Sequence, residues 1–189
     1  MKHHSTDKRL DQHGHTILFS EAEIDRRVQE LGKQITADYK DRDNGLIVVA
    51  MLKGSLYFVA DLTRAIDLDV AYDFMAIGSA IINGKDTGML KITRGVGLDL
   101  KGKDVLVVEE VVRTGLTANF MIEYIETMKP ASIQLCALLY NPDQLLIPVP
   151  IVYGAFEIDY RRVIGYGLDI KEHHRSLRDI VLLPENWND

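Results

Sequence analysis

Four short, continuous apolar runs constrain the fold more than any other feature of this sequence. They are GLIVVAML at 45–52, VLVV at 105–108, IQLCALL at 133–139 and IVYGAF at 151–156. Runs of this kind are typical of strands that are buried on both faces of a parallel sheet. Helical patterns follow the first two runs, from Leu56 to Ile66 and from Thr117 to Met128, before Pro130. This alternation predicts an α/β fold in which helices cover both faces of a central sheet.

Another helix is predicted near the N-terminus. Ser20 and Glu23 form a capping-box pattern, and the apolar residues that follow recur at helical spacing: Ile24, Val28, Leu31 and Ile35. Residues 1–16 are polar and carry four of the six histidines, His3, His4, His13 and His15. Their irregular spacing and the absence of cysteines beside them favour a disordered tail over a metal site. We therefore expect a single domain over residues 17–189.

The composition restricts the functional classes that suit this chain. Its 189 residues, 47% of them apolar, are enough for one domain with a full core. A net charge of -6 argues against a general nucleic-acid surface. The sequence has neither a membrane-spanning apolar stretch nor the apolar core of a signal peptide. Cys136, the only cysteine, lies in an apolar run, which favours a buried thiol in a cytoplasmic protein.

Residues 80–102 are rich in glycine and charged residues, and two interpretations fit them. The segment is either a long mobile loop or a hairpin with a polar tip.

The clearest chemical signal follows the strand predicted at 105–108. Glu109 and Glu110 stand at its carboxyl end, where open parallel sheets bind their ligands. Gly115 permits a close approach of the backbone, and the hydroxyls of Thr114 and Thr117 with nearby amides can form a phosphate nest. The two acids can accept hydrogen bonds from a sugar diol or help hold a hydrated Mg²⁺. A solvated acidic turn is the alternative, but two like charges at a buried strand end favour phosphosugar binding.

The stretch VLVVEEVVRTGLT also resembles the phosphoribosyl pyrophosphate signature of type I phosphoribosyltransferases. From about Ile17 onward the chain is similar to the hypoxanthine-guanine phosphoribosyltransferases. MLKGSLYFVADL resembles their pyrophosphate loop, DFMAIGS with GKDTGMLKI their flexible lid, and FEIDYRRVIGYGLDIKEHHRSL their base-binding C-terminal segment. The resemblance implies the type I phosphoribosyltransferase fold, a central parallel sheet flanked by helices, with a flexible lid and a small C-terminal hood. It also implies a homodimer or homotetramer.

The implied reaction transfers 5-phosphoribose from phosphoribosyl pyrophosphate to N9 of a purine, with Mg²⁺, and releases pyrophosphate. By resemblance, the donor's phosphates would contact Leu52, Lys53, Gly54, Val112, Thr114, Gly115, Leu116, Thr117 and Arg175. The Leu52–Lys53 bond would be cis, although a solvated Lys53 in an ordinary turn is an alternative. Glu109 and Glu110 would hold the ribose hydroxyls; the family usually has aspartate at position 110.

The resemblance further implies that Asp169 binds Mg²⁺, with Glu109 as a second candidate metal ligand. The alternative for Asp169 is a cap for a helix over 170–177. The base would contact Asn141, Arg162, Val163 and Asp169, and the lid would include Ser79 and Ala80.

Four residues depart from the family's pattern, and they gather at the base and the lid. The family has aspartate at 113 as a general acid/base, lysine at 141, an aromatic residue at 162 and tyrosine at 80; this chain has Arg113, Asn141, Arg162 and Ala80. Because arginine has a pKa above about 12, Arg113 cannot take up a proton at neutral pH. Asn141 can still form a hydrogen bond, but without the charge that strengthens it.

Three hypotheses follow from these departures. The first is a purine-salvage transferase whose activity is impaired or retuned. The second is a transferase for a different, acidic base that Arg113 and Arg162 attract. The third is a non-catalytic sensor that binds the donor or a nucleoside monophosphate and regulates a partner protein.

Overall fold

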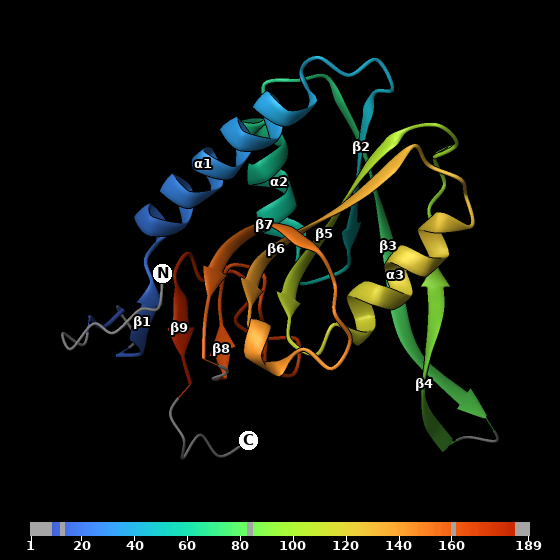
Figure 1. Cartoon of the computed structure of the whole chain (residues 1–189). Helices are drawn as coiled ribbons and strands as arrows, with labels where there is room; N and C mark the ends of the chain where they lie inside the picture. Colours follow the sequence, from blue (N-terminus) through green and yellow to red (C-terminus); the bar gives the residue numbers. More distant parts are fainter. Residues whose placement is uncertain (1–8, 12–13, 83–84, 160–161, 184–189) are drawn as a thin grey trace.

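The computed structural model describes residues 9–11, 14–82, 85–159 and 162–183, and its central element is a six-stranded sheet. The strand order is β4-β3-β2-β5-β6-β7, with β2 at Leu46–Met51, β3 at Val70–Ile82, β4 at Lys85–Arg94, β5 at Asp104–Val112, β6 at Ser132–Tyr140 and β7 at Ile151–Glu157. Neighbouring strands run parallel, except that β3 and β4 are antiparallel. The carboxyl ends of the parallel strands therefore meet at one edge of the sheet (Figure 1).

Helices cover both faces of this sheet, as the sequence predicts. Helices α1 (Glu21–Tyr39) and α2 (Leu56–Ala65) pack in one apolar cluster, and α3 (Leu116–Glu126) packs in a second. Figure 1 shows α1 and α2 side by side, with α3 on the other side of the strands. The predicted α/β fold with a flanked, mostly parallel sheet is confirmed.

The first helix begins at the predicted capping box. The Ser20 hydroxyl accepts from the Glu23 amide at 3.4 Å, and the Glu23 carboxylate accepts from the Ser20 amide at 2.9 Å. Each interaction satisfies a donor that the first helical turn leaves without a backbone partner. The predicted apolar positions of this helix, Ile24, Val28, Leu31 and Ile35, are all buried.

The apolar runs form the middle of the core. All six residues of β2 are buried, and so are the first six of β5. Cys136 in β6 is fully buried and free, and burial raises the pKa of its thiol well above the ordinary value. The prediction of a buried structural thiol is therefore confirmed.

A second, small sheet lies beside the main one and joins the two ends of the chain. Its order is β1-β9-β8, formed by Thr16–Phe19, Ile180–Leu182 and Val163–Ile164 in antiparallel pairing. Figure 1 shows β1 and β9 side by side. The hood expected from C-terminal residues therefore also includes a strand from the start of the chain.

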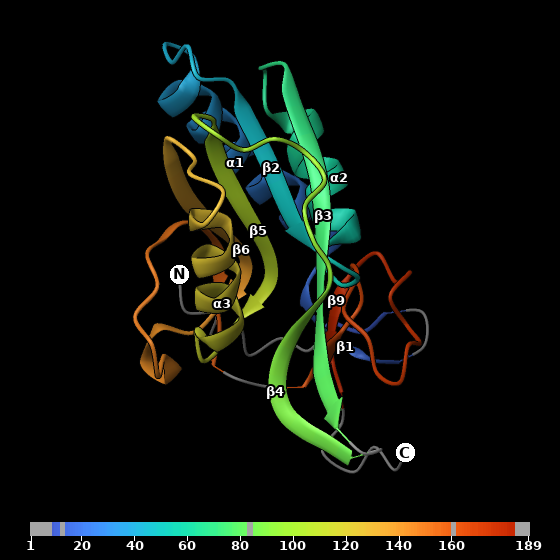
Figure 2. The same ribbon diagram turned by 90° about the vertical axis from the view of Figure 1, so that its right-hand side faces the viewer.

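The segment rich in glycine and charge is a hairpin as far as Arg94, and its residues 95–102 form neither helix nor strand. Strands β3 and β4 pair from Ala76↔Arg94 to Ile82↔Lys85. In Figure 2 this hairpin extends past the ends of the neighbouring strands. Its residues 83–84 lie outside the described residues, as do His3, His4 and His13 of the predicted tail. None of the helices in the described part of the chain has the length and apolar character that a membrane crossing requires.

Candidate functional site

The turn at residues 114–117 connects the end of β5 to the start of α3. Gly115 has a φ of +80°, and a Cβ on it would stand 2.4 Å from the Ile147 carbonyl oxygen. Only glycine fits both this conformation and this contact. The amides of Leu146 and Ile147 donate to the Thr114 carbonyl at 2.9 and 3.2 Å, which fixes the turn in place.

The same turn exposes the positive end of α3. The first backbone bond of the helix is donated by Asn119 to Gly115, so the amides of residues 116–118 precede the intrahelical ladder. The Leu116 amide makes only a long contact of 3.4 Å with the Thr114 hydroxyl. Such amides, together with the helix dipole, are suited to an anion such as a phosphate.

Glu109 and Glu110 form an unusual pair of buried acids at the end of β5. Glu109 is 5% exposed, and its Oε2 atom and that of Glu110 are buried without a hydrogen-bond partner among the described residues. Burial, reinforced by the Glu110 charge, raises the pKa of Glu109 to about 8. Burial also raises the pKa of Glu110, while the nearby Arg175 opposes this shift. Buried acceptors without partners are uncommon, so these oxygens are suited to a ligand's hydroxyl groups or to a cation.

The turn at residues 52–55 leads from β2 into α2 and lies against Glu110. The Leu52–Lys53 peptide bond is cis, as the sequence resemblance implies. A Cβ on Gly54 would stand 2.4 Å from Glu110 Oε1, so the absence of a side chain makes room for that carboxylate. The Ser55 hydroxyl donates to the Met51 carbonyl within the turn.

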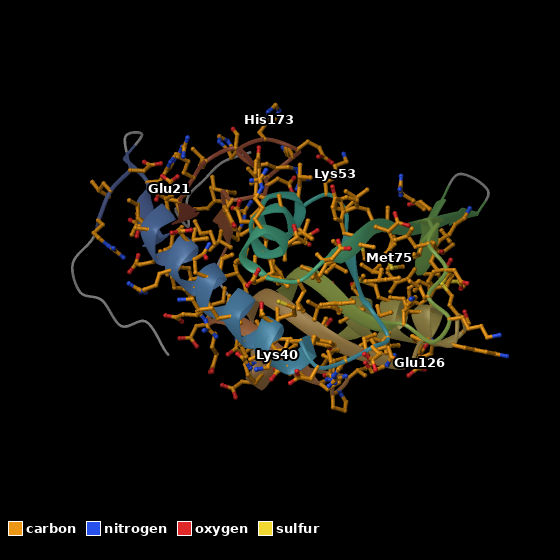
Figure 3. All side chains as sticks on the ribbon, turned by 90° about the horizontal axis from the view of Figure 1, so that it is seen from above. Glu21, Lys40, Lys53, Met75, Glu126 and His173 are labelled. Atoms are coloured by element: carbon orange, nitrogen blue, oxygen red, sulfur yellow. The ribbon has the colours of Figure 1, made fainter. Side chains whose placement is uncertain are left out.

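Lys53 extends from this turn toward the loop at residues 165–175. Its Nζ lies 3.1 Å from Glu172 Oε1, and both side chains are largely exposed. In Figure 3, Lys53 lies at the start of α2, near His173 of the loop. An exposed ion pair is worth little to stability, so Lys53 can exchange Glu172 for an anionic ligand at low cost.

The 165–175 loop packs directly on the 52–55 turn. Gly167 has a φ of +98°, and a Cβ on it would stand 1.9 Å from the Gly54 carbonyl oxygen. Arg175 bonds to three other residues of this loop. Its Nη1 donates to the Gly167 carbonyl at 2.8 Å, and its Nη2 lies 2.9 Å from both Asp169 Oδ1 and Glu172 Oε2. The Nε atom of Arg175 is buried without a partner among the described residues.

Asp169 is part of a turn and does not cap a helix. Its Oδ2 accepts from the Glu172 amide at 2.8 Å, and its Oδ1 pairs with Arg175. Residues 170–177, all of them described, form bridges, bends and turns without a helix. The alternative interpretation of Asp169 as a helix cap is therefore wrong.

Arg113 and Asn141 lie at the ends of neighbouring strands. The Asn141 amide donates to the Val112 carbonyl at 3.2 Å, which brings the two positions together. Arg113 is exposed, and its Nε donates to Gln144 Oε1 at 3.2 Å. Asn141 is 8% exposed, and its side-chain oxygen accepts from the Asp143 amide at 3.0 Å as the N-cap of the 3₁₀ helix η1 (Pro142–Gln144). The side-chain oxygen of Asn141 therefore already accepts a hydrogen bond within the protein.

The remaining predicted site residues lie on separate elements. Val163 pairs with Leu182 in the small sheet, and the Leu183 amide donates to the Arg162 carbonyl at 2.9 Å. Ser79 pairs with Leu90 in the hairpin, where the Thr87 hydroxyl donates to the Ala80 carbonyl at 2.7 Å. These contacts lie within the hairpin and within the small sheet, and do not join the four residues to the turns at 52–55 and 114–117.

The residues present fit a weakly coordinated Mg²⁺ better than a metal held by protein alone. Within the described ranges, no group of three or more His, Cys, Asp or Glu side chains is placed to hold a metal ion. Mg²⁺ commonly takes one or two carboxylates and completes its shell with phosphates and water. The unpartnered Glu109 oxygen and the partly exposed Asp169 match that donor set.

Sequence reasoning missed three residues that shape this site: Gly167, Glu172 and Gln144. The GYG pattern before Asp169 contained a usable signal, since glycines near a charged turn often mark positive φ. Glu172 and Gln144 carried no signal, because their partners Lys53 and Arg113 are brought to them only by the tertiary fold.

Comparison with known proteins gives consistent results. Residues 16–171 match the family model described as phosphoribosyl transferase domain. The chain is 40% identical over 172 residues to the hypoxanthine-guanine phosphoribosyltransferase of Dictyostelium discoideum, covering 89% of this chain and 95% of that protein. It is 36% identical over 179 residues to the hypoxanthine phosphoribosyltransferase of Haemophilus influenzae, covering 93% and 100%.

Comparison with solved structures leads to the same family. The structure is similar to a mutant of hypoxanthine phosphoribosyltransferase from Trypanosoma cruzi, complexed with the product IMP, with a TM-score of 0.84 at 34% identity and 94% of each chain covered. It is also similar to a hypoxanthine-guanine phosphoribosyltransferase from Bacillus anthracis, with a TM-score of 0.82 at 33% identity, covering 89% of this chain and 98% of that one.

Proposed function

The chain belongs to the phosphoribosyltransferase family, alongside the hypoxanthine-guanine phosphoribosyltransferases, and from this premise we propose that it transfers 5-phosphoribose from phosphoribosyl pyrophosphate to a purine base. One observation carries the proposal. The turn at 114–117 and the buried acids of β5 stand at the same edge of the sheet as Lys53 and the 165–175 loop, with Glu110 against Gly54 and Gly54 against Gly167. The turn at 114–117 suits the 5′-phosphate of the donor, and the two carboxylates suit the ribose hydroxyls. The basic residues Lys53 and Arg175 suit the pyrophosphate.

The 5′-phosphate is assigned to the 114–117 turn. Successive amides at the start of α3, together with the hydroxyls of Thr114 and Thr117, would surround its oxygens. Gly115 serves this function indirectly, because its positive φ turns the chain while the Ile147 carbonyl lies too close for any side chain. Val112 and Leu116 flank the turn and would contribute backbone contacts.

The ribose is assigned to the two acids of β5, and the pyrophosphate is assigned to the 52–55 turn and Arg175. Glu109, whose buried Oε2 has no partner among the described residues, would accept from the ribose hydroxyls, with Glu110 beside it. Lys53 and the Gly54 amide would bind pyrophosphate, since Lys53 needs only to leave an exposed ion pair with Glu172. Arg175 would contribute charge from the adjoining loop. Together these groups hold the donor with its anomeric carbon toward the base.

Mg²⁺ belongs to the proposal as a ligand of the donor. Asp169 and Glu109 are the carboxylates that would hold it, directly or through water. When bound, it would neutralise part of the pyrophosphate charge and so make pyrophosphate a better leaving group. Asp169 is partly exposed and tied to Arg175, so the ion and the arginine would share one carboxylate.

The base is assigned to the region of Arg113, Asn141, Arg162 and Val163. Arg113 is hydrogen-bonded to Gln144 and cannot act as a proton acceptor, so the usual acid/base group is replaced by a cation at that position. Asn141 offers its amide nitrogen, because its oxygen caps η1. We therefore expect slow transfer to hypoxanthine and guanine, since general acid/base groups contribute about 10² to 10⁴ in rate.

A base with a negative charge is the second candidate substrate. The observation that favours it is the cation at Arg113, close to Asn141 through the Val112 contact. Ala80 in the hairpin provides no aromatic ring for the closed site.

A homodimer or homotetramer and a cytoplasmic location complete the proposal. The exposed side chains of Leu56 and Tyr57 in α2 provide apolar surface for a second copy.

The proposal is tested by pyrophosphate release. The protein is incubated with phosphoribosyl pyrophosphate, Mg²⁺ and each of hypoxanthine, guanine, xanthine, adenine and a carboxylated pyrimidine in turn. Turnover with a 6-oxopurine supports the proposal, and turnover with the acidic base alone supports the second candidate. Donor binding without turnover for any base would overturn the transferase and favour a sensor.

A further inference from the structure

The carboxylate of Glu172 contacts both basic residues that are assigned to pyrophosphate. Its Oε1 lies 3.1 Å from Lys53 Nζ, and its Oε2 lies 2.9 Å from Arg175 Nη2. Lys53 and Glu172 are 119 positions apart in the sequence, so only the tertiary fold brings this cation to the acid. Glu172 therefore pairs with the two cations as the oxygens of a bound anion would.

The Glu172 side chain is charged, and its contacts can open. Hydrogen bonds from Arg175 and then from Lys53 hold the pKa of the Glu172 carboxyl below its ordinary value of 4.5, so it is an anion at neutral pH. The side chain is 61% exposed. Exposed ion pairs contribute little to stability, because water readily replaces each partner. Glu172 is thus an anion that a more highly charged ligand can displace.

The backbone presents Glu172 in a conformation that residues other than glycine seldom adopt. Lys171, Glu172 and His174 have φ values of +50°, +69° and +70°. The Glu172 amide donates to Asp169 Oδ2 at 2.8 Å, which fixes the turn that carries the side chain. Backbone outliers of this kind cluster at ligand-binding sites. Their presence here supports a function for the placement of this carboxylate.

A pyrophosphate group and Glu172 compete for the same donor atoms. A pyrophosphate that pairs with both Lys53 Nζ and Arg175 Nη2 takes the place of the Glu172 oxygens. When only a fraction of the molecules is free to bind, the apparent affinity falls in proportion to that fraction. A carboxylate that is paired in about two-thirds to nine-tenths of the molecules would lower the affinity about three- to tenfold.

We propose that Glu172 is an intramolecular competitor for pyrophosphate, which lowers the affinity of the protein for the pyrophosphate end of the donor and for the released product. This inference rests on the proposed transferase function. It gives Glu172 an effect opposite to that of Lys53 and Arg175. Replacing a residue that only supports the loop would weaken binding, whereas replacing a competitor strengthens it.

Calorimetry with two probes tests this effect. Inorganic pyrophosphate, at one fixed Mg²⁺ concentration, reports on the 52–55 turn and Arg175, and ribose 5-phosphate reports on the 114–117 turn. Glu172→Gln is expected to bind pyrophosphate about three- to tenfold more tightly than the parent and ribose 5-phosphate within about twofold. Glu30→Gln is the matched control, because Glu30 also pairs with an arginine three residues away at 2.9 Å, on α1. It should bind both probes as the parent does.

A second comparison separates competition from simple repulsion between Glu172 and the ligand. Lys53→Met removes one of the two cations that Glu172 and pyrophosphate share, and it weakens pyrophosphate binding by itself. In this background, competition remains only at Arg175, so the gain from Glu172→Gln should shrink to about twofold. Repulsion would leave the gain unchanged, because it does not depend on Lys53. Thermal melting shows that each variant is folded.

The outcomes distinguish the inference from the function on which it rests. A parent that binds pyrophosphate but turns over no base refutes the transferase, while the comparison of Glu172→Gln with the parent still tests the competition. The inference is overturned if Glu172→Gln binds pyrophosphate no more tightly than the parent, or if it binds ribose 5-phosphate with the same gain. An equal gain in the Lys53→Met background, or a parent that does not bind pyrophosphate, would also overturn it.

Discussion

The carbonyl oxygen of Gly54 lies so close to Gly167 that a Cβ on Gly167 would stand 1.9 Å from it. This contact joins the turn after β2 to the loop that carries Asp169 and Arg175. Two segments far apart in the sequence therefore form one wall of the site, and their separation is set by backbone atoms. A backbone contact of this kind cannot be relieved by rotating a side chain.

Gly167→Ala is expected to lower the free energy of unfolding by roughly 2 to 4 kcal/mol and to weaken pyrophosphate binding, since it adds both a clash and strain at a φ of +98°. Gly102→Ala is the matched control: Gly102 has a φ of +69° and nothing within 4 Å of the place a Cβ would take, so only about 1 kcal/mol of strain is expected. Urea denaturation of both variants measures the difference. Equal losses would show that the Gly54 contact contributes nothing.

Thr117→Ala is expected to weaken binding of a nucleoside 5′-monophosphate about three- to tenfold, because one hydrogen bond to the phosphate is lost. Thr127→Ala removes a hydroxyl from the other end of the same helix, where it donates to the Tyr124 carbonyl, and should leave the affinity unchanged. Calorimetry with the parent and both variants checks this. If Thr117→Ala binds as tightly as the parent, the phosphate lies elsewhere.

Asp169→Asn should remove most of the Mg²⁺ dependence of donor binding, since a neutral amide is a much weaker magnesium ligand than a carboxylate. Glu172→Gln is the control, because Glu172 also pairs with Arg175 at 2.9 Å but is not assigned to the metal. The measurement is the dissociation constant of phosphoribosyl pyrophosphate at several Mg²⁺ concentrations. A parent-like Mg²⁺ response in Asp169→Asn, or the same loss in both variants, contradicts the assignment.

Stability should depend on pH through Glu109. Burial and the Glu110 charge raise the pKa of Glu109 to about 8, above the ordinary value of 4.5 that it regains on unfolding. Between these values the folded protein binds the proton and the unfolded chain does not, so stability falls as pH rises through this interval. The fall is expected to be on the order of 1 to 3 kcal/mol.

Glu109→Gln should therefore make the fall in stability with rising pH smaller, leaving the part due to Glu110, whose pKa burial also raises, and should be more stable than the parent near pH 8. Thermal unfolding from pH 5 to pH 8.5 measures both curves. Glu123→Gln, which removes an exposed acid on α3, provides the control and should keep the parent's slope. A parent profile that is already flat would show that Glu109 has a normal pKa in the folded protein.

The fold was predictable because its signals are local. A buried parallel strand shows as an apolar run such as 46–51, and a capped helix shows as the Ser20 and Glu23 pattern, so neither depends on distant residues. Strand β1 at Thr16–Phe19 was not predictable in this way. Its pairing partner, β9 at Ile180–Leu182, lies at the other end of the chain, and four residues without alternation carry no clear period.

The geometry of the two turns to which we assign phosphate groups was predictable from sequence, and the contacts between the segments were less so. The turn at 114–117 follows from residue types that must stand in sequence to make a nest, and the expected cis bond at Leu52–Lys53 is present. In contrast, the contact of Glu110 with Gly54 and the hydrogen bond of Arg113 with Gln144 each join segments that only the tertiary fold brings together. Sequence shows which residues have the chemistry to bind a ligand. It does not show which of them already make hydrogen bonds or packing contacts with neighbours in the folded chain.

The final prediction concerns the replaced base contacts. Arg113 donates to Gln144, and the Asn141 oxygen caps η1, so neither offers a purine the proton acceptor or the cation expected at these positions. Restoring them with Arg113→Asp and Asn141→Lys together should raise turnover with hypoxanthine and guanine by about 10² or more, within the range typical of general acid/base catalysis. Donor affinity should change little, because the donor contacts are assigned to other residues.

The four proteins needed are the parent, each single variant and the double variant, compared by steady-state rates with both purines. Asn141→Lys also removes the cap of η1, which costs about 1 kcal/mol, so thermal melting must show that the variants stay folded at the assay temperature. Gln144→Ala serves as a control that releases Arg113 from this hydrogen bond without adding an acid. A parent with high activity that falls when Arg113 is replaced would give Arg113 a positive role and contradict the hypothesis that this replacement impairs purine transfer. Inactivity of all four proteins would place the defect beyond these two positions, and the hairpin at Ala80 would then be the next region to restore.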